Sequence, residues 1–220
     1  AQIPCAIGSY QPSLGQASCI LADPGHYVPA TNYQNQLECQ LGTFQPYSGA
    51  SSCSDAESGH YVDTNGSASQ MDCPPTTYNP ATGSNDRDDC VDVEPGHYSD
   101  EWGTAEHLEC ALGTYQPNPG QMSCLDADSG HFVSSSGATS QSACPAGTYN
   151  PSEASGSAAD CVPADPGHYV DSQASSSQTP CNLGTYQDSL GQLSCTDAAP
   201  GHYVSEEGQA EQTPASLDTY

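Results

Sequence analysis

The sequence predicts a small disulfide-rich fold, mostly irregular with short β-strands, arranged as an elongated tandem-repeat rod of six modules. Leu, Ile, Val and Phe together supply 24 of the 220 residues, which is too few for an ordinary hydrophobic core. Twelve cysteines are present, and they recur at regular spacing. An even number of regularly spaced cysteines in a chain poor in apolar residues is typical of small oxidised domains that lack a large core.

The cysteine spacing defines the repeat. Successive gaps alternate between 14 or 17 residues and a constant 20 residues, so one repeat is 34 or 37 residues long. We therefore expect six repeats, at residues 1–38, 39–72, 73–109, 110–143, 144–180 and 181–214. Residues 215–220 resemble the degenerate start of a seventh repeat, with Ala215 in the position of its first cysteine.

The same spacing favours one disulfide pattern. Bonds that close the short loops use every cysteine, whereas bonds across the 20-residue gaps leave Cys5 and Cys195 unpaired. Each short loop closed in this way contributes about 3 kcal/mol in the chain-entropy description. The alternative is a bond from Cys195 to Cys5 of a neighbouring chain, which would staple a polymer. The predicted pairs are Cys5–Cys19, Cys39–Cys53, Cys73–Cys90, Cys110–Cys124, Cys144–Cys161 and Cys181–Cys195.

Each repeat has two halves built from turns and brief strands. Gly and Pro stand at fixed phases and mark turns, and the segments "TYQ" and "HYV" between them fit very short strands. No segment has helical periodicity, so we expect no helices. Aromatic residues fill one fixed position in each half, and we expect each ring to form a miniature core beside a disulfide. These positions are Tyr10, Phe44, Tyr78, Tyr115, Tyr149 and Tyr186 in the first half, and Tyr27, Tyr61, Tyr98, Phe132, Tyr169 and Tyr203 in the second.

Charge and hydropathy exclude several classes of partner. The chain has 27 acidic residues and one basic residue, Arg87, so it cannot neutralise a nucleic-acid backbone or bind an anionic membrane surface. No apolar run is long enough to span a bilayer, and we expect no membrane insertion. The cysteine usage predicts an extracellular or cell-surface location. We expect the N-terminal "AQIPC" to be a mature end after signal removal or a cut from a longer chain.

The segments "CPAGTYNP" and "CALGTYQPNPGQMSC" resemble the cysteine-rich ephrin-receptor-like repeats, which are related to tumour-necrosis-factor-receptor modules. The Gly, aromatic, Gly and Cys positions match over the whole chain, and in that family the first two cysteines bond to each other. The resemblance implies an extracellular, non-enzymatic stalk or ectodomain with no cofactor. One departure is consistent: the cysteine expected three residues after the second is replaced by Ala22, Ala56, Val93, Ala127, Ala164 and Ala198.

Six copies of a motif such as "ADPGHYV" place a histidine at one position of each repeat: His26, His60, His97, His131, His168 and His202. No CxxC or HxxxH pattern indicates zinc, and only a β-solenoid would stack these histidines into a ladder. We expect them to be hydrogen-bonding or repeat-interface residues, with His26 paired to Asp23. His107 stands out of phase, where other repeats have glutamine, and is expected to be an exposed polar substitution.

Calcium is the one metal that the pattern supports. Acidic residues two apart follow several second cysteines and would project to one face of an extended strand, where they could chelate an ion. The alternative is a solvated acidic stripe that only screens cations. The calcium candidates are Asp55, Glu57, Asp92, Glu94, Asp126 and Asp128. One sequon, at Asn65, predicts N-linked glycosylation.

These observations favour a non-enzymatic extracellular structural repeat protein, the subunit of a cell-surface filament, hair or stalk. Its expected partners are further copies of itself, end to end or side by side, with glycans as a further possibility. The competing hypothesis is a monomeric cell-surface ectodomain that binds a protein or glycan ligand, with calcium if the acidic pairs bind it. Trp102, the single tryptophan, marks an irregular position where such a ligand could dock.

We expect non-reducing peptide mapping of the oxidised protein to recover the six short-loop pairs. Each peptide pair should span 14 or 17 residues. A cross-linked peptide that joins Cys5 to Cys195 would overturn this pairing in favour of the polymer staple.

Overall fold

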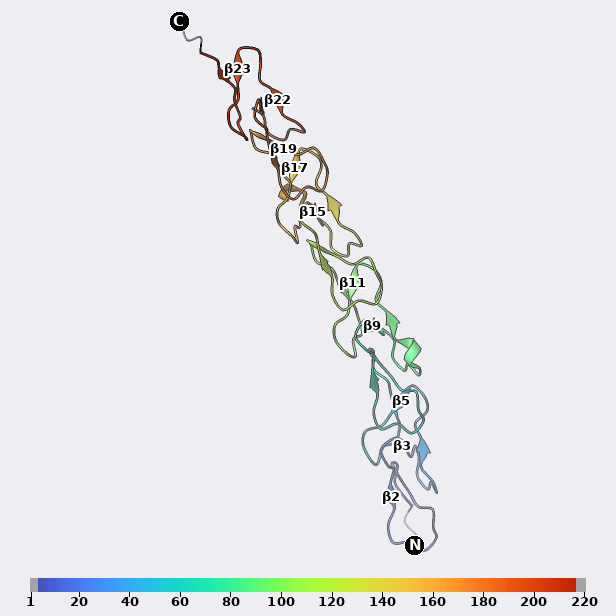
Figure 1. Cartoon of the computed structure of the whole chain (residues 1–220). Coiled ribbons are helices and arrows are strands. Elements are labelled where there is room, and N and C mark those ends of the chain that lie inside the picture. Colours follow the sequence, from blue (N-terminus) through green and yellow to red (C-terminus); the bar gives the residue numbers. More distant parts are fainter. Residues whose placement is uncertain (1–3, 217–220) are drawn as a thin grey trace. The chain divides into compact units, whose positions relative to one another are not determined.

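The computed structural model describes residues 4–216, which form short two-stranded hairpins with almost no helix (Figure 1). The predicted fold class, small, disulfide-rich and mostly irregular with short strands, is confirmed. The chain divides into two compact units. The first contains the residues up to Leu108 together with Pro119–Met122, and the second contains Glu109–Asn118 together with the residues from Ser123 onward.

Each repeat consists of two half-repeats, and each half-repeat contains one hairpin. A Cys half-repeat begins at a buried cysteine such as Cys39, and an Ala half-repeat begins at a buried alanine such as Ala56, or at Val93 in the third repeat. The strands of both kinds are two residues long and begin at equivalent positions. The two half-repeats are therefore variants of one hairpin, with and without a disulfide.

The Cys half-repeats contain β1 (Ser9–Tyr10) and β2 (Ile20–Leu21), β5 (Thr43–Phe44) and β6 (Ser54–Asp55), β9 (Thr77–Tyr78) and β10 (Val91–Asp92), β13 (Thr114–Tyr115) and β14 (Leu125–Asp126), β17 (Thr148–Tyr149) and β18 (Val162–Pro163), and β21 (Thr185–Tyr186) and β22 (Thr196–Asp197). The Ala half-repeats contain β3 (His26–Tyr27) and β4 (Leu37–Glu38), β7 (His60–Tyr61) and β8 (Met71–Asp72), β11 (His97–Tyr98) and β12 (Leu108–Glu109), β15 (His131–Phe132) and β16 (Ser142–Ala143), β19 (His168–Tyr169) and β20 (Thr179–Pro180), and β23 (His202–Tyr203) and β24 (Thr213–Pro214). Within each unit the two strands of a hairpin are antiparallel, as in β7 and β8, where His60 faces Asp72.

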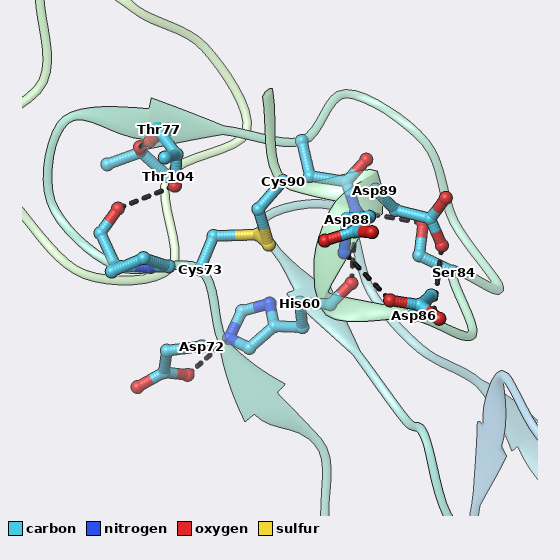
Figure 2. Close-up of a disulfide and its surroundings, with 12 residues drawn as sticks. His60, Asp72, Cys73, Thr77, Ser84, Asp86, Asp88, Asp89, Cys90 and Thr104 are labelled. Carbon is cyan, nitrogen blue, oxygen red and sulfur yellow. Dashed lines mark hydrogen bonds and ion pairs between the residues drawn. A yellow bond between two sulfur atoms is a disulfide. The ribbon is translucent and has the colours of Figure 1, made fainter. Parts of the chain in front are cut away.

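The cysteines pair across the short loops of the Cys half-repeats: Cys5–Cys19, Cys39–Cys53, Cys73–Cys90, Cys110–Cys124, Cys144–Cys161 and Cys181–Cys195. Each bond joins the start of a half-repeat to the residue before its second strand. Figure 2 shows the Cys73–Cys90 bond beside the loop that carries Asp86, Asp88 and Asp89. The disulfide thus fixes the base of each Cys hairpin.

Two short 3₁₀ helices correct the expectation that no helix is present. They are η1 (Arg87–Asp89) and η2 (Ala158–Asp160), and each lies in one of the two disulfide loops whose cysteines are 17 residues apart. Each begins with a capping box, from Asp86 to Asp89 and from Ser157 to Asp160. The extra residues of the longer loops are therefore accommodated as one capped turn.

The core lies along two lines of small residues rather than under the aromatic rings. The first line is the cysteine or alanine that begins each half-repeat. The second follows the aromatic residue and alternates between valine, such as Val28 and Val62, and an amide, such as Asn79. Most of the rings remain half-exposed, and Tyr203 is 48% exposed. The expected aromatic core is therefore corrected: the small residues are the most deeply buried side chains, and of the twelve rings, which all lie within residues 4–216, only Tyr61, at 9% exposed, belongs to the core.

The buried amides complete their own hydrogen bonds. Asn79 donates from Nδ2 to the Ser84 hydroxyl at 2.8 Å and to the His60 carbonyl at 3.2 Å. Its Oδ1 accepts the Ala81 amide N–H at 3.0 Å. A polar group can occupy the core here because each of its atoms that needs a partner has one.

Backbone hydrogen bonds connect each half-repeat to the next one within a unit. The amide of Gly42 donates to the Val62 carbonyl at 2.8 Å, and the amide of Val62 donates to the Ser84 carbonyl at 3.0 Å. A third bond runs back from the loop, where the Gly66 amide donates to the Cys39 carbonyl at 2.8 Å. The same bonds recur at equivalent positions, so the half-repeats are joined by their backbones rather than by a shared apolar core.

This stacking requires glycine at one position. Gly42 has φ of 78°, and a Cβ at this residue would overlap the carbonyl oxygen of Gly83 in the half-repeat after next. The third repeat departs from this requirement, because Thr76 occupies the equivalent position with φ of 77°. A β-branched residue in the left-handed region is strained.

We expect Thr76→Gly to raise the free energy of unfolding by about 1 kcal/mol, because it removes a Cβ from the left-handed region. Thermal unfolding of the oxidised protein measures the change. The reverse substitution in another repeat, Gly113→Thr, should lower stability by more, since its Cβ would overlap the Ala154 carbonyl. An unchanged or lower midpoint for Thr76→Gly would contradict this account of the turn.

Candidate functional site

The repeat histidines close the turn that precedes their own strand. Their Nδ1 atoms lie 3.0 to 3.4 Å from the carbonyl oxygen two residues earlier, as in His26 and Pro24. A carbonyl oxygen only accepts, so Nδ1–H is the donor in each of these hydrogen bonds. The expected pairing of His26 with the Asp23 side chain is corrected, because the Asp23 carboxylate accepts a hydrogen bond from Gln36 instead.

The His60 imidazole meets an acid of the facing strand. His60 Nε2 lies 3.0 Å from Asp72 Oδ1 across the β7–β8 hairpin (Figure 2). The same imidazole lies against Gly103 of the following repeat. A Cβ added to Gly103 would be only 3.2 Å from His60 Nε2. His26 and Gly66, and His168 and Gly208, are related in the same way within their units. These histidines lie where one repeat's hairpin meets the next repeat's turn.

A glutamine–acid clamp takes the place of the missing disulfide in the Ala half-repeats. Gln178 stands 14 residues after Ala164, the separation of a 14-residue disulfide loop. Its Oε1 accepts the Asp165 amide N–H at 2.7 Å, and its Nε2 donates to Asp165 Oδ2 at 2.7 Å. Equivalent clamps join Gln36 to Asp23, Gln70 to Glu57, and Gln141 to Asp128. In the sixth repeat only the backbone half remains, because Ala199 replaces the acid.

The third repeat replaces this clamp with a histidine cluster. His107 stands at the glutamine position, and its ligand atom converges with those of Glu94 and His97 to within 4.8 Å of one another. His107 Nδ1 lies 3.5 Å from Glu94 Oε2, is buried, and has no hydrogen-bond partner. The rings of His97 and His107 meet edge to face with centroids 4.3 Å apart.

Tyr78 covers this cluster from the preceding hairpin. Its ring packs edge-on against His107 with centroids 4.6 Å apart, and its hydroxyl donates to Glu94 Oε1 at 3.3 Å. Burial, followed by the charge and hydrogen bond of Glu94, raises the pKa of Tyr78 above its usual value. The hydroxyl therefore remains a donor to the carboxylate through the neutral range.

His107 was not expected to take part in a site, and the structure corrects that expectation. Its side chain is 25% exposed and contacts two predicted site residues, Glu94 and His97, rather than lying free on the surface. The sequence contained a signal, since a histidine replaces glutamine at a position fixed in the other repeats. Only the fold shows that this position faces the repeat histidine.

The remaining predicted site residues are not brought together. Within residues 4–216, Glu94 is the one calcium candidate that belongs to a group of three converging ligand side chains. Glu57 and Asp128 are held in clamps, and Asp55 and Asp92 lie against Gly83 and Gly120 of the following repeat. Asn65 lies in an exposed turn, and Trp102 is 66% exposed. Calcium binding and glycosylation stay predictions.

Together the hairpins and disulfides define a tandem array of small oxidised modules. Residues 96–144 match the family model described as tyrosine-protein kinase ephrin type A/B receptor-like. The resemblance seen in the sequence is confirmed: the chain contains an ephrin-receptor-like cysteine-rich segment, and its six disulfides fit a cysteine-rich repeat family. No curated protein matches the chain.

The matched family is extracellular in character and non-catalytic, and a disulfide-rich protein of this kind fits an extracellular or secreted location. Within residues 4–216 no helix has the length and apolar character needed to cross a membrane.

The clamp can be tested by truncation. We expect Gln178→Ala to lower the free energy of unfolding by about 1 kcal/mol, because it removes two hydrogen bonds, one of them to a carboxylate. Gln212→Ala is the matched control, since it removes only the bond from the Ala199 amide and should cost about half as much. Denaturant unfolding at one pH and salt concentration measures both. Equal effects would show that the acid contributes nothing to the clamp.

Proposed function

We propose that the protein is a non-enzymatic extracellular structural repeat protein, the subunit of a cell-surface filament, hair or stalk that assembles with copies of itself. The observation that carries the proposal is a set of exposed apolar side chains at equivalent positions of several repeats. The first position lies two residues after the cysteine and holds Ile7, Leu41, Leu112 and Leu183. The second begins the second strand and holds Ile20, Leu37, Met71, Val91, Leu108, Leu125 and Val162.

A surface that repeats with the period of the fold suits a partner with the same period. Isolated exposed leucines are ordinary on protein surfaces, but exposed apolar groups at a constant position in many repeats provide a regular contact array. A second copy of the chain carries the matching array. Contacts that are heterologous and do not close would build a filament.

The charge sets a condition on assembly. The formal net charge of −26 makes copies repel one another, so association requires screening by salt or by bound cations. The proposed filament should therefore form more readily as ionic strength rises. Calcium would act through the acidic surface if the predicted acidic pairs bind it.

The alternative function is a cell-surface ectodomain that binds a protein or glycan ligand. Trp102 favours it, because this single exposed tryptophan breaks the repeat pattern. A cleft of about 300 Å³ lies nearby and is lined by Ser99, Asp100, Glu101, Thr104, Glu106 and Leu108. One irregular site of this kind suits one ligand rather than a periodic partner.

Electron microscopy and sedimentation velocity of the native oxidised protein test the two functions. We expect filaments or lateral bundles whose amount increases with protein and salt concentration. The variant L41S/L183S removes two exposed leucines of the regular array and should lower the assembled fraction.

The control variant L14S/L190S removes two leucines that are 91% and 59% exposed, against 47% and 61% for Leu41 and Leu183, but that lie in the hairpin loops. It should assemble like the native protein. Single short particles under all conditions would contradict the filament, and loss of ligand binding in Trp102→Ala would then support the ectodomain.

A further inference from the structure

We propose that Glu94, His97 and His107 bind one divalent transition-metal ion of the zinc class. The three ligand atoms lie within 4.8 Å of one another on a single half-repeat. Two imidazoles and one carboxylate form a ligand set that zinc uses in proteins, with the fourth position left for water. Imidazole nitrogens favour zinc, copper or nickel, whereas calcium prefers oxygen ligands alone.

The hydrogen bonds leave a lone pair available on each histidine. His97 donates from Nδ1 to the Pro95 carbonyl at 3.3 Å, which leaves Nε2 free to coordinate an ion. His107 Nδ1 is buried and has no hydrogen-bond partner. An unpartnered buried nitrogen is unfavourable unless something at the site satisfies it, and a metal ion does so.

The distance between two of the ligands is already suitable. His107 Nδ1 and Glu94 Oε2 are 3.5 Å apart. Two ligands at a tetrahedral zinc ion are about 3.4 Å apart, given bonds of about 2.1 Å. The neighbouring ligands therefore need little movement to share an ion.

Tyr78 supplies the support that such a site requires. Its hydroxyl donates to Glu94 Oε1, which leaves Oε2 directed at His107, and its ring holds the His107 imidazole edge to face. Residues that orient metal ligands through hydrogen bonds strengthen binding. Tyr78 is thus a positioning residue, whereas Glu94, His97 and His107 are the ligands.

The position of the site gives the ion a structural role. His107 stands 14 residues after Val93, where the Cys half-repeats have a disulfide and the other Ala half-repeats have the glutamine clamp. The third Ala half-repeat has neither of these closures. A metal bound by Glu94, His97 and His107 would close the same hairpin, at the same place, by coordination.

Zinc titration of the full oxidised chain tests the proposal, with calorimetry for affinity and equilibrium dialysis for stoichiometry. We expect one Zn²⁺ ion per chain at a site distinct from weak binding to the acidic surface. His107→Gln should lower the affinity by at least about 100-fold, since loss of a direct ligand costs more than loss of a supporting residue. Glu94→Gln should also weaken binding strongly.

His107→Gln introduces the residue that the other repeats have at this position, so the fold should be retained. The control is His131→Gln, which changes the equivalent of His97 in a repeat where Gln141 stands at the His107 position; its Zn²⁺ affinity should be unchanged. Cobalt bound in place of zinc should show the visible absorption of a four-coordinate ion, and that absorption should disappear in His107→Gln. Absence of a one-to-one site, or affinity that His107→Gln leaves unchanged, would overturn the proposal.

Discussion

The close approach of backbone to backbone at the first glycine of each half-repeat is the constraint on which the rest of the structure depends. At Gly42 the chain adopts a left-handed conformation so that its amide reaches Val62 while the Gly83 carbonyl lies against its α-carbon. A Cβ would occupy the space of that carbonyl, so three successive half-repeats meet at one residue with no side chain. The apolar core can therefore be small, because the contacts that join half-repeats are hydrogen bonds between main chains.

A hairpin with two-residue strands is not stable by itself, and the chain uses three kinds of closure to hold it. The Cys half-repeats use disulfides, and most Ala half-repeats use a glutamine that bonds both the amide and the carboxylate of an acid, as Gln178 does with Asp165. The two closures occupy equivalent positions, so the lost cysteine of the related family is replaced rather than simply absent. This exchange also explains part of the acidic composition, because the clamp needs a carboxylate beside each buried alanine.

The sequence predicted the class of fold well because cysteine, glycine and aromatic residues recur at fixed spacing, and spacing is what a repeat fold constrains. Predictions from the sequence were wrong where they depended on which side-chain atoms face each other. The rings were expected in the core, but the small residues Ala56 and Val62 are more deeply buried than most of them, since the backbones approach too closely for a ring to fit between them. His26 was expected to bond Asp23, but Gln36 competes for that carboxylate from a distance of 13 residues in sequence. To predict the site at His107, one must know which residues face each other across a hairpin. Strands of two residues are too short for the alternation of their side chains to show this register.

The third repeat shows why departures from a repeat are more informative about function than the repeat itself. Thr76 replaces glycine in a left-handed conformation, Ser99 replaces the buried valine, and His107 replaces the clamp glutamine. The first is strained and the last gives up two hydrogen bonds, so neither is explained by stability of the hairpin alone. These substitutions lie between Thr76, directly before β9, and His107, directly before β12, around Tyr78 and the cluster of Glu94, His97 and His107. Several unfavourable substitutions gathered in the third repeat indicate that this repeat has a role that the stability of its hairpins does not explain. An ion held by Glu94, His97 and His107 would offset the stability that the lost glutamine clamp contributed.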